Sequence, residues 1–121
     1  MERCDSIPLI FKCNEIHVTD RDYWDEIIQL TFLSVEGENI SFTRLSYDDE
    51  IYIEYNDQTN YLYSFYENVD FILRETTLNV NVKPKKQKNM SNVIEIVFNS
   101  KNDDLEKILY ALKTPPICIS M

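Results

Sequence analysis

Glycine is almost absent from this sequence, because Gly37 is the only one among 121 residues. Loops that cradle phosphate groups need several glycines, which allow the backbone to approach the ligand closely. The composition therefore excludes a glycine-rich nucleotide-binding loop. Long apolar runs are also missing, since the stretches at 7–11 and 93–98 are far shorter than the roughly 20 residues that a membrane-spanning helix needs.

The first residues lack the basic start and the continuous apolar centre of a secretory signal. We therefore expect a cytoplasmic protein with no membrane partner. Cysteine is scarce as well: Cys4, Cys13 and Cys118 cannot all pair, and none belongs to a Cys-x-x-Cys motif. These residues are expected to be free thiols in a reducing compartment, with Cys13 and Cys118 acting as small core residues.

Residues that could hold a metal or carry out catalysis are few. His17 is the only histidine, so no zinc site of the usual ligand spacing can be assembled. A nucleophile pair of His17 with a cysteine stays open on composition alone, but the local sequence offers no nucleophile elbow and no oxyanion loop. The carboxylates of 48–50 and Glu54 suggest calcium or paired-carboxylate chemistry, yet the EF-hand pattern and its turn glycine are absent. We predict no catalytic residue, no metal and no cofactor, and hence a protein that is not an enzyme.

Charge is abundant and uneven. The chain carries 12 basic and 21 acidic residues, a net charge of −9. Residues 1–82 hold 17 acids and five bases, a net of −12, whereas residues 83–121 hold four acids and seven bases, a net of +3. Such a field repels nucleic acid and attracts a basic protein partner, although an acidic surface also serves solubility. The lysine-rich segment 83–92 is predicted to be an exposed basic loop that does not bind nucleic acid directly.

Short runs of alternating apolar and polar residues, rich in tyrosine and phenylalanine, predict half-buried strands. We expect about six to eight antiparallel strands, in the usual range for such sheets. The segment 20–26 reads as an acidic loop, 36–39 as a hairpin turn with its glycine where positive φ is useful, and 47–50 and 56–60 as further turns. The expected strands are 7–18, where Pro8 confines the start to a sheet edge, and 27–35, 40–45, 51–55, 61–66, 69–73, 78–82 and 93–98.

One helix is expected over 102–113. Asn102 is its predicted cap, the acids at 103–104 favour its first turn, and prolines at 115–116 end it. Its apolar residues fall at i, i+3, i+4 and i+7 and predict one buried stripe, formed by Leu105, Ile108, Leu109 and Leu112. The fold class is therefore predicted as α+β, an antiparallel β-meander sheet with one C-terminal helix packed on it, in a single domain spanning 1–121.

Aromatic residues near the predicted turns suggest a protein-binding surface, because tyrosine and tryptophan dominate interface hot spots. The pattern does not decide which face of the hairpin at 51–66 is buried, although tyrosines cluster around it, namely Tyr52, Tyr61, Tyr63 and Tyr66. The predicted partner-binding residues combine these aromatics with nearby acids and are Asp22, Tyr23, Trp24, Asp25, Asp48, Asp49, Glu50, Tyr52 and Glu54.

The sequence resembles the bacterial "immunity protein ten" family of polymorphic toxin and contact-dependent inhibition systems. The similarity covers most of the chain and rests on strand patterns and one short polar signature. The signature is Tyr52-Ile53-Glu54 followed by Asn56-Asp57-Gln58 and a tyrosine-rich return. The strand and helix patterns that agree are Ile28–Leu33, Val69-Asp70-Phe71, Leu78–Val82, Ile94–Phe98 and Leu105–Leu112.

The resemblance implies a cytosolic antidote used in bacterial competition, which binds a cognate toxin domain and neutralises it. Many such toxins are nucleases with basic clefts, so an acidic partner could block the cleft by mimicking phosphate charge. The alternative is a phage or viral protein that imitates nucleic acid and inhibits a host nuclease or DNA-binding protein. A third possibility, a subunit of a larger assembly, would show an extended apolar surface rather than an acidic one.

Overall fold

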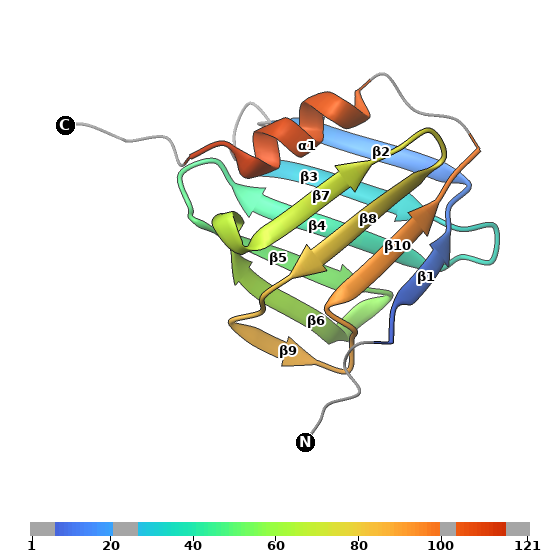
Figure 1. The fold of residues 1–121 in the computed structure, drawn as a ribbon, viewed down its shortest axis with the longest axis horizontal. Helices are drawn as coiled ribbons and strands as arrows, with labels where there is room; N and C mark the ends of the chain where they lie inside the picture. The colour runs from blue at the N-terminus through green and yellow to red at the C-terminus, as the bar shows by residue number, and fades with distance from the viewer. Residues whose placement is uncertain (1–6, 21–26, 100–103, 116–121) are drawn as a thin grey trace.

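The computed structural model describes residues 7–20, 27–99 and 104–115, which form two facing β-sheets and one helix (Figure 1). Antiparallel sheets with a single C-terminal helix packed on them confirm the predicted α+β class. The four-stranded sheet has the order β1 (Leu9–Lys12), β10 (Val93–Val97), β8 (Thr77–Val82) and β7 (Val69–Leu73). The six-stranded sheet has the order β2 (Glu15–Asp20), β3 (Ile27–Leu33), β4 (Asn39–Leu45), β5 (Glu50–Tyr55), β6 (Asp57–Phe65) and β9 (Lys86–Lys88).

The prediction of a single meander sheet is wrong in one respect, because the segment 7–18 contributes strands to both sheets. The chain changes sheets between two consecutive residues. The Cys13 amide donates to the Val97 carbonyl oxygen of β10 at 2.7 Å, and the Asn14 amide donates to the Leu33 carbonyl oxygen of β3 at 2.7 Å. The segment 7–18 is largely apolar, which conceals this switch, because residues of both strands pack on the same core.

Strand β1 pairs with β10 in parallel, whereas the other described strand pairs are antiparallel. It lies at an edge of its sheet, as Pro8 predicted. The predicted turn at 56–60 is shorter than expected. Only Asn56, with φ of 66°, lies between β5 and β6, and its side-chain oxygen accepts a hydrogen bond from the Asn39 amide.

The prediction that 83–92 is a loop is also wrong in part, because β9 lies inside it and extends the six-stranded sheet. Strand β9 pairs with β6 and places Lys88 opposite Tyr61 and Lys86 opposite Tyr63. The lysines misled the interpretation, since charged residues are typical of loops. They are equally typical of edge strands, where they discourage pairing with another chain.

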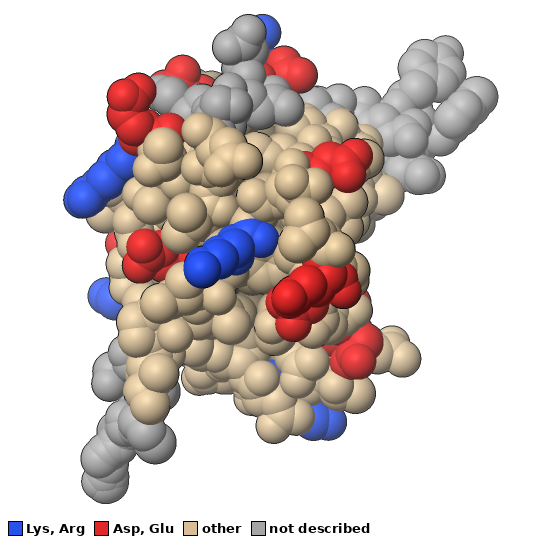
Figure 2. Space-filling model, turned by 90° about the vertical axis from the view of Figure 1, so that its right-hand side faces the viewer, with Lys and Arg blue, Asp and Glu red and all other residues tan. Residues whose placement is uncertain are grey.

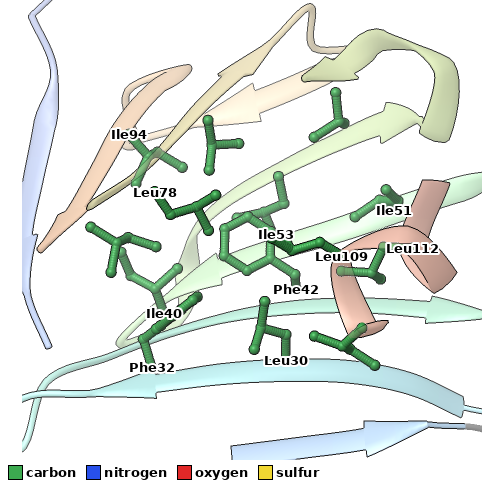
Figure 3. Close-up of a cluster of buried hydrophobic side chains, with 14 of the residues drawn as sticks. Leu30, Phe32, Ile40, Phe42, Ile51, Ile53, Leu78, Ile94, Leu109 and Leu112 are labelled. Atoms are coloured by element: carbon green, nitrogen blue, oxygen red, sulfur yellow. The ribbon is translucent and has the colours of Figure 1, made fainter. Parts of the chain in front are cut away.

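The core lies between the two sheets and is built from inward-facing residues of their strands, with the exception of β9, whose residues are exposed (Figure 3). Three phenylalanine rings connect the layers edge to face. Phe32 and Phe42 of the six-stranded sheet have ring centroids 6.2 Å apart, and Phe42 lies 5.7 Å from Phe71 of the four-stranded sheet. Such pairs add about 0.5–1.5 kcal/mol beyond the area that they bury.

Helix α1 (Leu105–Lys113) packs on β2, β3 and β7 and on the 3-10 turn η2 (Tyr66–Asn68), so it closes one side of the sandwich (Figure 1). Its four predicted stripe residues are buried, which confirms that prediction. The helix begins later than predicted: its N-cap is Asp104, and Asn102 lies outside the described residues. In the part of the chain that is described, no helix is long and apolar enough to cross a membrane.

Candidate functional site

The outer face of the six-stranded sheet carries the tyrosines that the sequence could not assign to a side. Strand alternation places Ile51, Ile53 and Leu62 in the core, whereas Tyr52 and Tyr63 point away from it and remain half-buried. None of the described elements packs over these rings, because α1 contributes to the core on the opposite face. Among the described residues nothing covers this face, so it is available to a partner.

Three of these side chains form one aromatic cluster, which we call the tyrosine row: Tyr52, Tyr61 and Tyr63. Tyr52 lies directly opposite Tyr63 in the β5–β6 register, with ring centroids 4.9 Å apart, and the Tyr61 ring is 5.6 Å from that of Tyr63 and 6.1 Å from that of Tyr52. The Tyr52 hydroxyl donates to Glu54 Oε1 at 2.7 Å. Burial, reinforced by this hydrogen bond, raises the pKa of the Tyr52 phenol well above its usual value.

Charges of both signs border the tyrosine row. On one side, Lys86 and Lys88 of β9 are the cross-strand neighbours of Tyr63 and Tyr61. Glu50 forms an ion pair with Lys85, and the Lys85 ammonium also lies 4.9 Å from the centroid of the Phe65 ring. The hydrogen bond to Glu50 raises the pKa of Lys85, and the charges of Asp49 and Asp48 act in the same direction. The site is thus less uniformly acidic than the sequence predicted.

The predicted acids of 48–50 lie in and beside the β4–β5 turn, next to the tyrosine row. Two hydrogen bonds hold the backbone of the turn. Arg44 Nε donates to the Asp48 carbonyl oxygen at 2.7 Å, and the Tyr66 amide donates to the Asp49 carbonyl oxygen at 2.9 Å. Asp48 Oδ1 accepts a hydrogen bond from the Glu50 amide at 3.2 Å. Asp49 is exposed and Asp48 is half-buried. These bonds fix the backbone of the turn and the Asp48 carboxylate.

Arg44 supports this turn from inside the protein and was missed by sequence reasoning. It occupies an inward-facing position of β4 and is only 2% exposed. Its Nη1 donates to the Leu112 carbonyl oxygen of α1 at 2.7 Å, and its guanidinium lies 4.7 Å from the centroid of the Tyr66 ring. The signal was present, since Arg44 follows Ile40 and Phe42 at the two-residue spacing of the core face.

Two hollows lie on either side of Glu50 and Tyr63. The larger has a volume of about 360 Å³ and is lined by Glu50, Tyr63, Lys85 and Lys86. The smaller, of about 160 Å³, is lined by residues of β4, the turn and the tyrosine row: Thr43, Arg44, Leu45, Asp48, Glu50, Tyr52 and Tyr63. Hollows with convergent polar groups beside exposed aromatics can seat side chains of a protein partner.

Five of the predicted binding residues are brought together in this way: Asp48, Asp49, Glu50, Tyr52 and Glu54. The other four, Asp22, Tyr23, Trp24 and Asp25, lie outside the described residues. By contrast, Figure 2 shows the end of the molecule that carries β1 and the β3–β4 hairpin, where acidic and basic side chains are spread over a mainly uncharged surface. The turn at 46–49 lies at the other end of β4 from that hairpin.

The cysteine and histidine considered as a nucleophile pair have other partners. Cys13 Sγ donates to the Glu15 carbonyl oxygen at 3.2 Å, and burial raises the pKa of this thiol. His17 is exposed on β2, with its Nε2 2.9 Å from Glu15 Oε2. Over the described ranges, no group of three or more histidine, cysteine, aspartate and glutamate side chains could hold a metal ion.

Comparison of the chain with protein-family models, with curated proteins and with solved structures finds no match.

Proposed function

We propose that this chain is a cytoplasmic antidote that acts by binding alone, covering the active cleft of a cognate toxin domain. The observation that carries the proposal is the juxtaposition of the tyrosine row with the acidic turn at 46–49, on a sheet face that no described element covers. The sequence resemblance described above supports the same function.

The chemistry of this face suits a basic protein surface. Tyrosine rings supply contact area at a low cost in conformational entropy, and their hydroxyls remain able to form hydrogen bonds. Asp48 and Asp49 lie on a turn whose carbonyls are already bonded to Arg44 and Tyr66, so little ordering is needed when a partner binds. The net charge of −9 would speed the approach of a basic cleft.

The test is protection of a bacterial host that expresses the product of the neighbouring gene, because the gene of an antidote is expected to lie beside that of its toxin. We expect the wild-type chain to restore growth and to form a stable complex with that product. An Asp48→Asn/Asp49→Lys variant should protect poorly, because it changes the charge of the turn. The carbonyl oxygen of the asparagine side chain can still accept the hydrogen bond from the Glu50 backbone amide, so the turn keeps this bond. Tyr52→Ala should weaken the complex by about tenfold or more, as expected for an interface aromatic.

A matched control is available at the opposite end of β4 and on the other sheet. The Glu36→Gln/Glu75→Lys variant changes the net charge from −9 by the same +3, to −6, at two exposed hairpin positions. It should protect as well as wild type. Full protection by the turn variant, or equal loss in both variants, would rule out the proposed surface. Failure of the wild-type chain to protect would rule out the antidote function itself and favour the viral inhibitor.

A further inference from the structure

Strand β7 lies at an edge of the four-stranded sheet, and its hydrogen bonds show which of its backbone groups face away from β8. The Arg74 amide donates to the Thr77 carbonyl oxygen at 2.8 Å, and the Lys83 amide donates to the Asn68 carbonyl oxygen at 2.9 Å. These two bonds fix the ladder between β7 and β8, because hydrogen-bonded pairs alternate with non-bonded pairs in antiparallel strands. Every second residue between positions 68 and 74 therefore bonds to β8.

The intervening residues direct their backbone groups away from β8. These are Val69, Phe71 and Leu73, which are the non-bonded partners of Val82, Val80 and Leu78 in the register. Their N–H and C=O groups line the outer edge of the four-stranded sheet. Such an edge is a template for an added strand unless it is covered or blocked.

A groove runs along this edge, between β7 and α1. It has a volume of about 420 Å³, and its lining comes from both elements: Asp70, Phe71, Leu73, Glu106, Leu109, Tyr110 and Lys113. The helix runs opposite to the strand, because Lys113 near its C-terminus reaches the start of β7. Lys113 Nζ donates to the carbonyl oxygens of Tyr66, at 2.8 Å, and of Val69. Lys113 thus closes one end of the groove and leaves the Phe71 and Leu73 edge groups open.

The groove combines apolar side chains with negative charge. Phe71 and Leu73 pack partly against the core, and Tyr110 is a rim aromatic that is 77% exposed. Asp70 and Glu106 are exposed and have no ion pair within the described residues. The two carboxylates outnumber the single Lys113 ammonium in the lining of the groove, so this lining carries a net negative charge and favours a basic ligand.

We propose that this groove binds an extended basic segment of a partner protein, which adds to β7 as a fifth strand of the four-stranded sheet. Side chains on one face of the added strand would pack on Leu73 and Leu109 and be apolar. Lysine or arginine on its other face would lie near Asp70. Backbone hydrogen bonds supply affinity in this mode of recognition, and alternate side chains supply specificity.

A second copy of the chain fits the groove less well than a basic segment. Two copies that each carry −9 repel one another, and both would bring Asp70 and Glu106 to the shared edge. The proposed groove lies on a different sheet from the tyrosine row, so it stands independently of the antidote function.

The test uses a fluorescent eight-residue peptide that alternates valine with lysine, added to the full chain. We expect binding in an anisotropy titration and slower hydrogen exchange at the Phe71 and Leu73 amides. Two derivatives, each methylated on the backbone nitrogen of alternate residues, separate strand addition from simple charge attraction. One of them should lose binding, since its methyl groups face β7, and the other should retain it.

Charge is tested by an Asp70→Lys/Glu106→Lys variant, which should bind the lysine peptide about tenfold or more weakly. A Glu15→Lys/Glu36→Lys variant makes the same change in net charge at two exposed positions that do not line the groove, and it should bind normally. A glutamate version of the peptide should not bind. Equal binding of both methylated peptides, unchanged exchange at Phe71 and Leu73, or a dimer that protects these amides without peptide would each overturn the proposal.

Discussion

At the scale of single residues, the environment of a side chain decides its chemistry more than its type does. Tyr52 and Tyr110 are both surface tyrosines, but Tyr52 is held by Glu54 and two neighbouring rings, whereas Tyr110 is largely exposed. Glu50 and Glu54 were predicted to be partner-binding acids. The structure pairs one with Lys85 and bonds the other to Tyr52, so Asp49 is the carboxylate most open to a partner.

Cys13 gives a prediction at this scale. Burial raises its pKa above the usual 9.0, so the native thiol keeps its proton to higher pH than the thiol of the unfolded chain. The Cys13 contribution therefore lowers the free energy of unfolding as pH rises above about 9, and has no effect below it. In a chain with Cys4 and Cys118 replaced by serine, we expect slow alkylation of native Cys13 by iodoacetamide at pH 8. Alkylation as fast as in urea-unfolded protein would contradict the buried position.

At the scale of elements, α1 is held to the sheets at its C-terminus by two cations as well as by its apolar stripe. Arg44 bonds the Leu112 carbonyl oxygen, and Lys113 bonds carbonyl oxygens at the start of β7. The last carbonyls of a helix lack partners within the helix, and cations there also complement its dipole. The inner face of β4 thus connects the acidic turn to the helix.

Replacing Arg44 tests this connection. Arg44→Met keeps much of the side-chain volume but leaves the Asp48 and Leu112 carbonyl oxygens without their donor, which costs roughly 1–3 kcal/mol for each buried group. We expect a clear loss of stability in urea unfolding, together with faster hydrogen exchange in the turn at 46–49. An Arg74→Met variant, on an exposed hairpin, is the control and should unfold as wild type does. Unchanged stability in Arg44→Met would show that Arg44 does not hold the turn.

Much of this element structure could be predicted. Two-residue alternation located most strands, and the i, i+3, i+4, i+7 stripe located the helix and its buried face. The pairing of strands into two sheets could not be predicted, because it depends on where Cys13 and Asn14 direct their amides. Strand β9 was missed because lysines signal both loops and edges. The turn and Tyr52 were recognised as a site, but Lys85 was not, since its pairing with Glu50 joins residues far apart in the sequence.

At the scale of the whole molecule, two separate surfaces are candidates for binding a basic partner. The tyrosine row and the acidic turn lie on the six-stranded sheet, and the β7–α1 groove lies at the edge of the four-stranded sheet. Each combines aromatic side chains with carboxylates. A net charge of −9 adds a long-range attraction for basic partners to both.

The central claim, that a basic toxin domain binds at the acidic turn and the tyrosine row, is tested most directly by association rates over a salt series. Purified wild-type chain should associate with the toxin domain more slowly as salt rises past physiological strength, where the screening length is about 8 Å. The Asp48→Asn/Asp49→Lys variant should associate more slowly at low salt, and its association rate should depend less on salt. The rate of the Glu36→Gln/Glu75→Lys variant should follow that of wild type more closely. A wild-type rate that is independent of salt, or identical behaviour of the two variants, would contradict the account.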